Sequence, residues 1–421
     1  MVKKIVFFTL VLLLASGTAL FSEGENLRLK IAVMGPGDEL YFWWGHIGLI
    51  IEDSDANKNS FYDYGVFSFK SNNFFVNFAF GRLLYHCSVS TAERNLALYV
   101  YFNRDITIYT LDIPAAARAK VKEFADVNVL PENRNYYYHH FRDNCSTRIR
   151  DIIDLATDGQ FKEQYIQTPG RFTLRQHVRR HTWFSPAVDW ILNFWMGQVI
   201  DRPITVWDDM FLPSEVGRTI EDFLYTDADG VRRKLVTNVE KVFTAENRPG
   251  VLDTPRRQWP RELAFSLVLS AIFGFFFILQ AKGKRIGRIL AGVSMSLAGL
   301  VFGFAGLLLY FLSLFTNHDY TYQNANMLFC TPLLLASVPF GICYALTKKQ
   351  DKLVFYGAAL RFIWLLSVLG IFVSMLIKLL PMFYQQNLTD QMLMLPIALV
   401  FSLQPVGLCE IKEKYLKRKK A

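Results

Sequence analysis

From Leu263 onward the chain contains five long apolar runs, and these runs constrain its fold more than any other feature. They cover approximately residues 263–281, 289–315, 327–347, 353–380 and 391–409. Each is long enough to cross about 30 Å of hydrocarbon as an α-helix. The whole chain is 52% hydrophobic and only 20% charged, which is too apolar for an ordinary cytosolic protein. The sequence therefore predicts an all-α bundle of five transmembrane helices over residues 263–421.

Basic residues lie on alternate connections between these runs. Lys and Arg fill residues 282–288, residues 348–352 and the tail from 412 to 420, whereas residues 317–326 and 381–390 contain none. The positive-inside rule places the tail in the cytoplasm and the chain before the first run outside it. The net charge of +9 is therefore a topology signal rather than the basic surface of a nucleic-acid-binding protein, and we expect no nucleic-acid partner.

The N-terminus has the layout of a secretory signal peptide. Lys3 and Lys4 precede an apolar run from Ile5 to Ala15 and then small residues, so residues 1–22 are predicted to be a signal peptide. Residues 23–262 have globular composition, and the same topology puts them outside the cytoplasm. We divide this part into a domain over 23–168 and a helical extension, hairpin and linker over 169–262.

The first of these segments mixes strand and helix signals. Short runs rich in β-branched and aromatic residues, bounded by turn residues, predict strands at Leu29–Met34, His46–Glu52, Ser60–Phe69 and Thr107–Ile113. Apolar residues at three-to-four spacing predict helices at Ala115–Val127 and Ser146–Ala156. Further on, Asp229-Gly230 is typical of a hairpin turn. The domain is therefore expected to be of the α+β class.

Cys145 is the candidate nucleophile. Three of the five cysteines fall in the apolar runs, which leaves Cys87 and Cys145. Cys145 follows Asn144 at the predicted start of a helix, where free backbone N–H groups and the helix dipole favour a thiolate. A disulfide with Cys87 is the alternative in an oxidising compartment.

His46 is the candidate base. It stands between Gly45 and Ile47 at the head of an apolar strand, an awkward position for a core histidine. The next predicted strand offers Asp63, with Tyr62 in reserve, to orient the imidazole as the third member of a triad does. On the residue pattern alone, a structural histidine and an unrelated cysteine are an equal alternative.

Four motifs give the chain a family resemblance. They are W-G-H-I-G-L, Y-D-Y-G-V-F-S-F, F-G-R-L-L-Y-H and P-E-N-R-N-Y-Y-Y-H-H-F-R-D-N-C-S-T-R-I-R-D. Over about Leu29 to Asp154 the sequence resembles the N-terminal domain of the Lnb-type lipoprotein N-acyltransferase family, which is similar to circularly permuted papain-like folds such as lecithin:retinol acyltransferase relatives. The resemblance implies that Cys145 is the nucleophile, His46 the base and Asp63 the orienting group.

The implied reaction is lipoprotein N-acylation at the outer face of the bacterial inner membrane. An acyl chain would pass from a membrane phospholipid to the Cys145 thiol and then to the α-amine of a diacylglyceryl-cysteine lipoprotein. The backbone N–H of Cys145 or Ser146 would stabilise the oxyanion, and no metal or cofactor is expected. Two alternatives stay open, namely a membrane-anchored cysteine hydrolase (amidase or peptidase) of the cell wall and a non-catalytic receptor or transport subunit.

Five further residues are candidates for substrate contact. Trp44 precedes the Gly45-His46 pair and, with Trp43, would form a lip for lipid, while Tyr64 adjoins Asp63. Arg104, Asn144 and Arg148 are expected to contact lipid phosphate, although arginines near a helix start also pair with neighbouring carboxylates.

Overall fold

The computed structural model describes residues 24–70 and 73–404, so the predicted signal peptide and the basic tail lie outside the described residues. The chain forms two compact units. The first, which we call the sheet unit, comprises the described residues up to Phe78, Arg82–Leu174 and Pro203–Val251. The second, the membrane unit, comprises Ala79–Gly81, Arg175–Arg202 and the described residues from Leu252 on.

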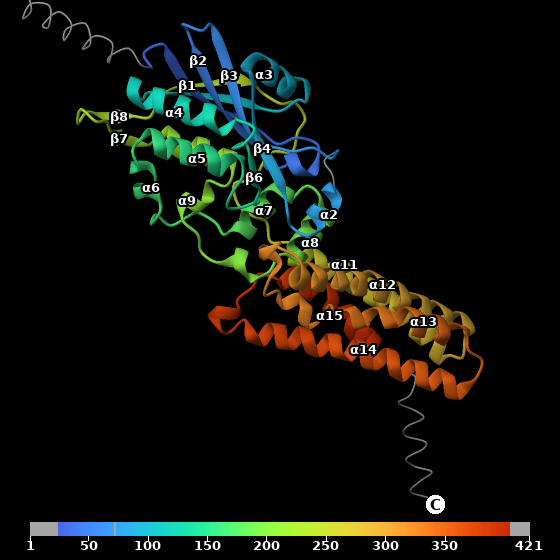
Figure 1. Cartoon of the computed structure of the whole chain (residues 1–421). Helices are drawn as coiled ribbons and strands as arrows, with labels where there is room; N and C mark the ends of the chain where they lie inside the picture. The colour runs from blue at the N-terminus through green and yellow to red at the C-terminus, as the bar shows by residue number, and fades with distance from the viewer. Residues whose placement is uncertain (1–23, 71–72, 405–421) are drawn as a thin grey trace, which may run out of the picture. The chain divides into compact units, whose positions relative to one another are not determined.

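A seven-stranded antiparallel sheet forms the centre of the sheet unit (Figure 1). Its order is β6-β4-β3-β2-β1-β5-β9. The strands are β1 (Leu27–Met34), β2 (His46–Asp53), β3 (Lys58–Val66), β4 (Leu84–Thr91), β5 (Ile106–Leu111), β6 (Asn135–Tyr137) and β9 (Val236–Phe243). The strands β7 (Leu224–Thr226) and β8 (Arg232–Lys234) form the predicted hairpin.

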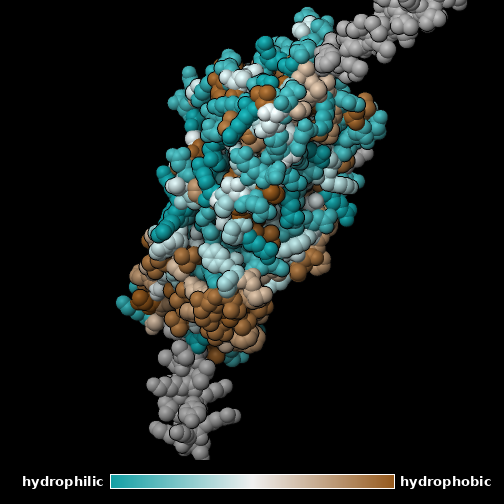
Figure 2. All heavy atoms as spheres, turned by 90° about the vertical axis from the view of Figure 1, so that its left-hand side faces the viewer, coloured by the Kyte–Doolittle hydropathy of each residue, from teal (hydrophilic) through white to brown (hydrophobic). Residues whose placement is uncertain are grey.

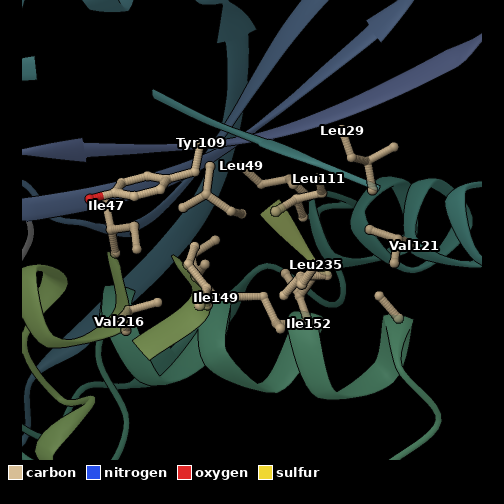
Figure 3. Close-up of a cluster of buried hydrophobic side chains, with 14 of the residues drawn as sticks. Leu29, Ile47, Leu49, Tyr109, Leu111, Val121, Ile149, Ile152, Val216 and Leu235 are labelled. Atoms are coloured by element: carbon tan, nitrogen blue, oxygen red, sulfur yellow. The ribbon is translucent and has the colours of Figure 1, made fainter. Parts of the chain in front are cut away.

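Helices cover both faces of this sheet. On one face lie α4 (Ala115–Asn128), α5 (Cys145–Ala156) and α10 (Pro213–Glu221), and α3 (Ala92–Tyr101) packs on the other. Figure 3 shows the larger core, in which Leu49 of the sheet faces Ile149 and Ile152 of α5. The shorter helices are η1 (Leu40–Phe42), α2 (Phe74–Ala79), α6 (Gln160–Tyr165) and α9 (Val206–Asp209). Burial on both faces explains why β2 is almost continuously apolar.

The α+β prediction is confirmed for this unit, and all four predicted strands and both predicted helices exist close to their expected bounds. Three further strands, β4, β6 and β9, were not predicted from the sequence. Of these, β6 has only three residues, and β9 pairs with β5 from more than 120 residues away. Such pairings depend on tertiary contacts rather than on local pattern.

The membrane unit is helical. Three helices are long and apolar enough to cross a membrane, namely α11 (Trp259–Ala281), α12 (Arg285–Phe315) and α14 (Gln350–Ile377). The two other predicted spans are shorter than expected. One is the apolar segment Pro332–Leu346, made of η5 (Pro332–Ala336) and α13 (Ser337–Leu346), and the other is α15 (Leu388–Ser402). Short 3-10 turns connect them, at η3 (Asp319–Thr321), η4 (Ala325–Leu328) and η6 (Pro381–Phe383).

The exposed surface of the membrane unit is strongly hydrophobic. Figure 2 shows hydrophobic side chains gathered over these helices, and large apolar residues such as Phe265, Leu297 and Phe362 are each more than half exposed. Exposed apolar area of this kind is the surface that lipid covers in a membrane protein.

Part of the predicted extension belongs to the membrane unit. Arg175–Arg202 contains most of α7 (Leu174–Thr182), α8 (Pro186–Trp195) and η2 (Gln198–Asp201). Phe194 of α8 is fully buried in the same apolar cluster as residues of α12, α14 and α15. The extension therefore packs on the transmembrane helices of its own unit.

Candidate active site

Asn144 fixes the start of α5. Its side-chain Oδ1 accepts hydrogen bonds from the N–H groups of Ser146 at 2.8 Å and Thr147 at 3.0 Å. Its Nδ2 donates to the carbonyl oxygens of His140 at 2.7 Å and Phe211 at 3.0 Å. The residue is only 4% exposed. Asn144 thus acts as a helix cap, and all four of these bonds are made within the protein.

Cys145 is the first residue of α5, directly after this cap. Its side chain is a free thiol and is 9% exposed. A Cβ atom at Gly65, near the end of β3, would lie 3.6 Å from the Cβ of Cys145, so the thiol-bearing residue adjoins the end of that strand. The dipole at a helix start stabilises negative charge on such a sulfur.

His46 and Asp63 form a hydrogen-bonded pair across β2 and β3. Asp63 is paired in register with Gly48, which places it diagonally opposite His46 on the same face of the sheet. The His46 Nε2 atom lies 2.6 Å from the Asp63 Oδ1 atom. Among the described residues, Nδ1 of His46 has no hydrogen-bond partner, so this ring nitrogen is open.

Gly45 allows His46 to begin the strand where it does. Gly45 has φ +80°, and a Cβ atom there would lie 2.7 Å from the carbonyl oxygen of Met34. Any other residue would be strained in this conformation and would clash with the end of β1.

The electrostatic surroundings of His46 favour its charged form. Burial alone would lower its pKa, but the electrostatic effects of Tyr99, Asp63 and Cys145 together raise the pKa well above its usual value. The Tyr99 ring of α3 stacks against the imidazole with 6.1 Å between ring centroids. An imidazolium held by Asp63 is the partner that a thiolate requires.

Cys87 and Tyr62, the other residues considered beside Cys145 and Asp63, have different surroundings. Cys87 is a free thiol that is 2% exposed, and burial raises its pKa to about 12. It therefore forms no disulfide with Cys145 and resists ionisation. Tyr62, the reserve for Asp63, donates instead to Asp126 of α4 at 2.5 Å. In the part of the chain that the structure describes, no cluster of His, Cys, Asp or Glu could hold a metal ion.

The other two predicted phosphate contacts, like Asn144, have protein partners. Arg148 forms a bidentate pair with Asp143, with N···O distances of 2.6 and 2.8 Å. Arg104 is 1% exposed, donates from Nε to the Gly35 carbonyl at 2.9 Å and lies 4.9 Å from the centroid of the Tyr99 ring. Arg104 therefore places a buried positive charge against the ring of Tyr99.

The two aromatic candidates differ in exposure. Trp44 is half-buried, next to the His46 strand, with its ring 6.5 Å from that of Trp43. Tyr64 is 1% exposed within the main core, and burial, followed by the neighbouring Cys87, raises its pKa. Of the two side chains, only Trp44 keeps an exposed surface.

Two groups at the site were missed from the sequence. Tyr99 of α3 stacks on His46, and the Tyr136 hydroxyl of β6 would lie 3.9 Å from a Cβ atom at Gly65. The alternation of a strand would have put Tyr136 and Tyr138 on one face and Tyr137 on the other, but so short a strand could not be predicted. The Ser146 N–H, which was predicted as a possible oxyanion donor, instead donates to the side chain of Asn144.

An α+β domain that carries a buried Cys beside a half-buried His–Asp pair, followed by helices that suit a membrane, defines a membrane protein with a candidate thiol site. The family comparison agrees with this class. Residues 22–180 match the Lnb N-terminal periplasmic domain, and residues 258–404 match the Lnb transmembrane domain. The chain belongs to the Lnb family, and its N-terminal domain is periplasmic. Comparison with curated proteins and with solved structures finds no match.

Proposed function

We propose that this protein is a lipoprotein N-acyltransferase that uses Cys145, His46 and Asp63. The observation that carries the proposal is the free Cys145 at the capped start of α5, electrostatically coupled to a His46 that Asp63 holds by one nitrogen. Membership of the Lnb family supports the substrate class. The α+β domain would be a permuted papain-like fold, and the membrane unit would cross the inner membrane five times with the tail in the cytoplasm.

In the first half-reaction the Cys145 thiolate attacks the ester carbonyl of a membrane phospholipid. A C–S bond forms and the C–O ester bond breaks, which leaves an acyl thioester on the enzyme. The imidazolium of His46 gives its proton to the departing oxygen of the lysophospholipid. Asp63 keeps the imidazole ring in the required orientation throughout.

In the second half-reaction the α-amine of a diacylglyceryl-cysteine attacks the thioester. A C–N bond forms, the C–S bond breaks, and His46 takes the proton that the amine loses. The Cys145 thiolate is restored, and the product is a triacylated lipoprotein. Both substrates are held by the bilayer, which accounts for a periplasmic domain joined to transmembrane helices. Trp44, the substrate-facing candidate with an exposed surface, would contact lipid.

The test is to replace the nucleophile in cells that have no other lipoprotein N-acyltransferase. Cys145→Ala should abolish the conversion of diacylated to triacylated lipoprotein, measured by mass spectrometry of N-terminal lipopeptides. Cys87→Ala is the matched control, because it removes another free buried thiol of the same core, and it should retain conversion. A third acyl chain that persists in Cys145→Ala would overturn the proposal. Cleavage of cell-wall peptides by the wild-type protein in place of lipoprotein acylation would identify it as a hydrolase.

A further inference from the structure

The start of α5 offers only one backbone donor to an oxyanion at Cys145. Thioester chemistry passes through tetrahedral intermediates, whose negative oxygen needs preorganised hydrogen-bond donors. The N–H groups of Ser146 and Thr147 are both bound to the Oδ1 atom of Asn144. Only the N–H of Cys145, the first in the helix, has no acceptor among the described residues. A second donor must therefore come from elsewhere.

Gly65 leaves a small space beside the thiol. It has φ +90°, and a Cβ atom there would be 3.6 Å from the Cβ of Cys145 and 3.9 Å from the hydroxyl oxygen of Tyr136. Both atoms thus lie around one point that the missing side chain leaves unfilled. A Cβ atom there would also lie 3.9 Å from a ring carbon of Tyr138, so one atom of that size fits at contact distance between the nucleophile and the phenol.

The Tyr136 hydroxyl is a buried donor with nothing to donate to. Its oxygen has no hydrogen-bond partner among the described residues. Leaving such a group unsatisfied costs about 1–3 kcal/mol, and unsatisfied groups of this kind in native proteins call for an explanation. Burial, followed by the neighbouring Cys145, raises the pKa of Tyr136, so the hydroxyl keeps its proton.

The backbone of Tyr136 is held by the sheet and its ring by Arg148. In the sheet, Tyr136 is paired in register with Tyr85 of β4. The guanidinium of Arg148 lies 4.3 Å from its ring centroid and is itself fixed by Asp143. A preorganised donor needs support of this kind, because a donor that must move into place stabilises the transition state less.

We propose that the Tyr136 hydroxyl and the Cys145 N–H form the oxyanion hole of this enzyme. The inference rests on the proposed function and adds a catalytic residue to it. In each half-reaction the carbonyl oxygen becomes negative as the C–S or C–N bond forms, and the hydroxyl donates a hydrogen bond to it without giving up its proton. The charge returns to neutral when the C–O or C–S bond breaks.

The experiment compares Tyr136→Phe with wild-type full-length protein in detergent–phospholipid micelles. The change removes one oxygen and keeps the ring against Arg148. We expect single-turnover acylation of Cys145 to slow about 100-fold, the usual effect of losing one oxyanion donor. The rate and pH dependence of Cys145 alkylation by iodoacetamide should stay as in wild type, because alkylation forms no oxyanion.

Two neighbouring hydroxyls serve as controls. Tyr137→Phe changes a side chain on the same strand that is 70% exposed, and Ser146→Ala removes another buried hydroxyl that has no partner among the described residues, on the residue next to Cys145. Both variants should acylate at the wild-type rate. Their alkylation rates also report whether each variant is folded around Cys145.

Three outcomes would overturn the assignment. They are an unchanged acylation rate in Tyr136→Phe, a shifted pH dependence of alkylation, which would mean that the phenol acts on the sulfur, and an equal loss in Ser146→Ala. These results would leave the proposed function in place if Cys145→Ala is inactive. An active Cys145→Ala would instead refute the proposed function and the oxyanion hole together.

Discussion

The surroundings of Arg175 in the membrane unit contrast with those of Cys145 in the sheet unit. Arg175 is fully buried, and each guanidinium nitrogen has a partner. Nε donates to Asp201 at 2.8 Å, and the other two nitrogens donate to the backbone carbonyls of Asn193, Met196 and Gly197. Around Cys145, Nδ1 of His46 and the hydroxyl of Tyr136 have no such partner among the described residues.

This difference distinguishes buried polar groups that stabilise the fold from polar groups that remain available for a reaction. Four of the five N–H groups of the Arg175 guanidinium are bound within the protein, so this side chain holds its neighbours in place. The groups around Cys145 are each fixed on one side, by Asp63 or by Arg148, and open on the other. Natural proteins tolerate unsatisfied polar groups of this kind at sites where a reaction uses those groups.

The sharpest test of the structural side is Arg175→Met. The change leaves Asp201, which is 5% exposed, without its buried partner. Breaking a buried ion pair in this way costs about 3–5 kcal/mol, so the thermal unfolding midpoint in micelles should fall clearly. Arg202→Met, at an exposed arginine in the same unit, is the control. Equal midpoints in the two variants would show that Arg175 does not hold the membrane unit together.

The chemical side is tested by Asp63→Asn, which keeps a hydrogen-bonding side chain but removes its charge. In wild type the imidazolium of His46 persists up to its raised pKa, so acylation should decline as the pH rises through that value. Without the Asp63 carboxylate the pKa of His46 falls, and the decline should move to lower pH. We expect a loss of about 10-fold at neutral pH, because each unit of pKa corresponds to a factor of ten.

The pH profile of single-turnover acylation measures this shift, with Asp55→Asn as the control at an exposed turn position. The raised pKa of His46 also makes the stability of the folded protein depend on pH. A raised pKa means that protonated His46 contributes stability below its ordinary pKa of about 6.5, and that this contribution is lost as the pH rises through the raised value. An alkaline limb that stays in place in Asp63→Asn would show that Asp63 does not tune the base.

Much of this arrangement could be predicted from the sequence because its signals are local. The apolar runs, the strand that begins at His46 and the helix start at Cys145 depend on period and neighbouring residues. Asp63 on the next strand was the preferred partner of His46, with Tyr62 in reserve, and the structure pairs Asp63 with His46. The basic connections gave a topology that puts the N-terminal domain outside, in agreement with its periplasmic family match.

The remaining features depend on contacts that no local pattern encodes. Asn144 at a helix start is compatible with a cap or with a substrate contact. Its bonds to the N–H groups of Ser146 and Thr147 make it a cap, and the carbonyls of His140 and Phe211 bind its amide nitrogen. Arg104 is buried because Phe42 and Tyr99 enclose its guanidinium. The two short apolar helices also differ from their predicted spans, since hydropathy does not tell where a helix ends.

Direct detection of the acyl-enzyme tests the central claim most closely. Purified protein would be incubated with phospholipid in the absence of any amine acceptor, digested and mapped by mass spectrometry. The account predicts one acyl chain on the peptide that contains Cys145, released by hydroxylamine as a thioester is. An unmodified Cys145 peptide, or an acyl chain attached to a different side chain, would contradict it.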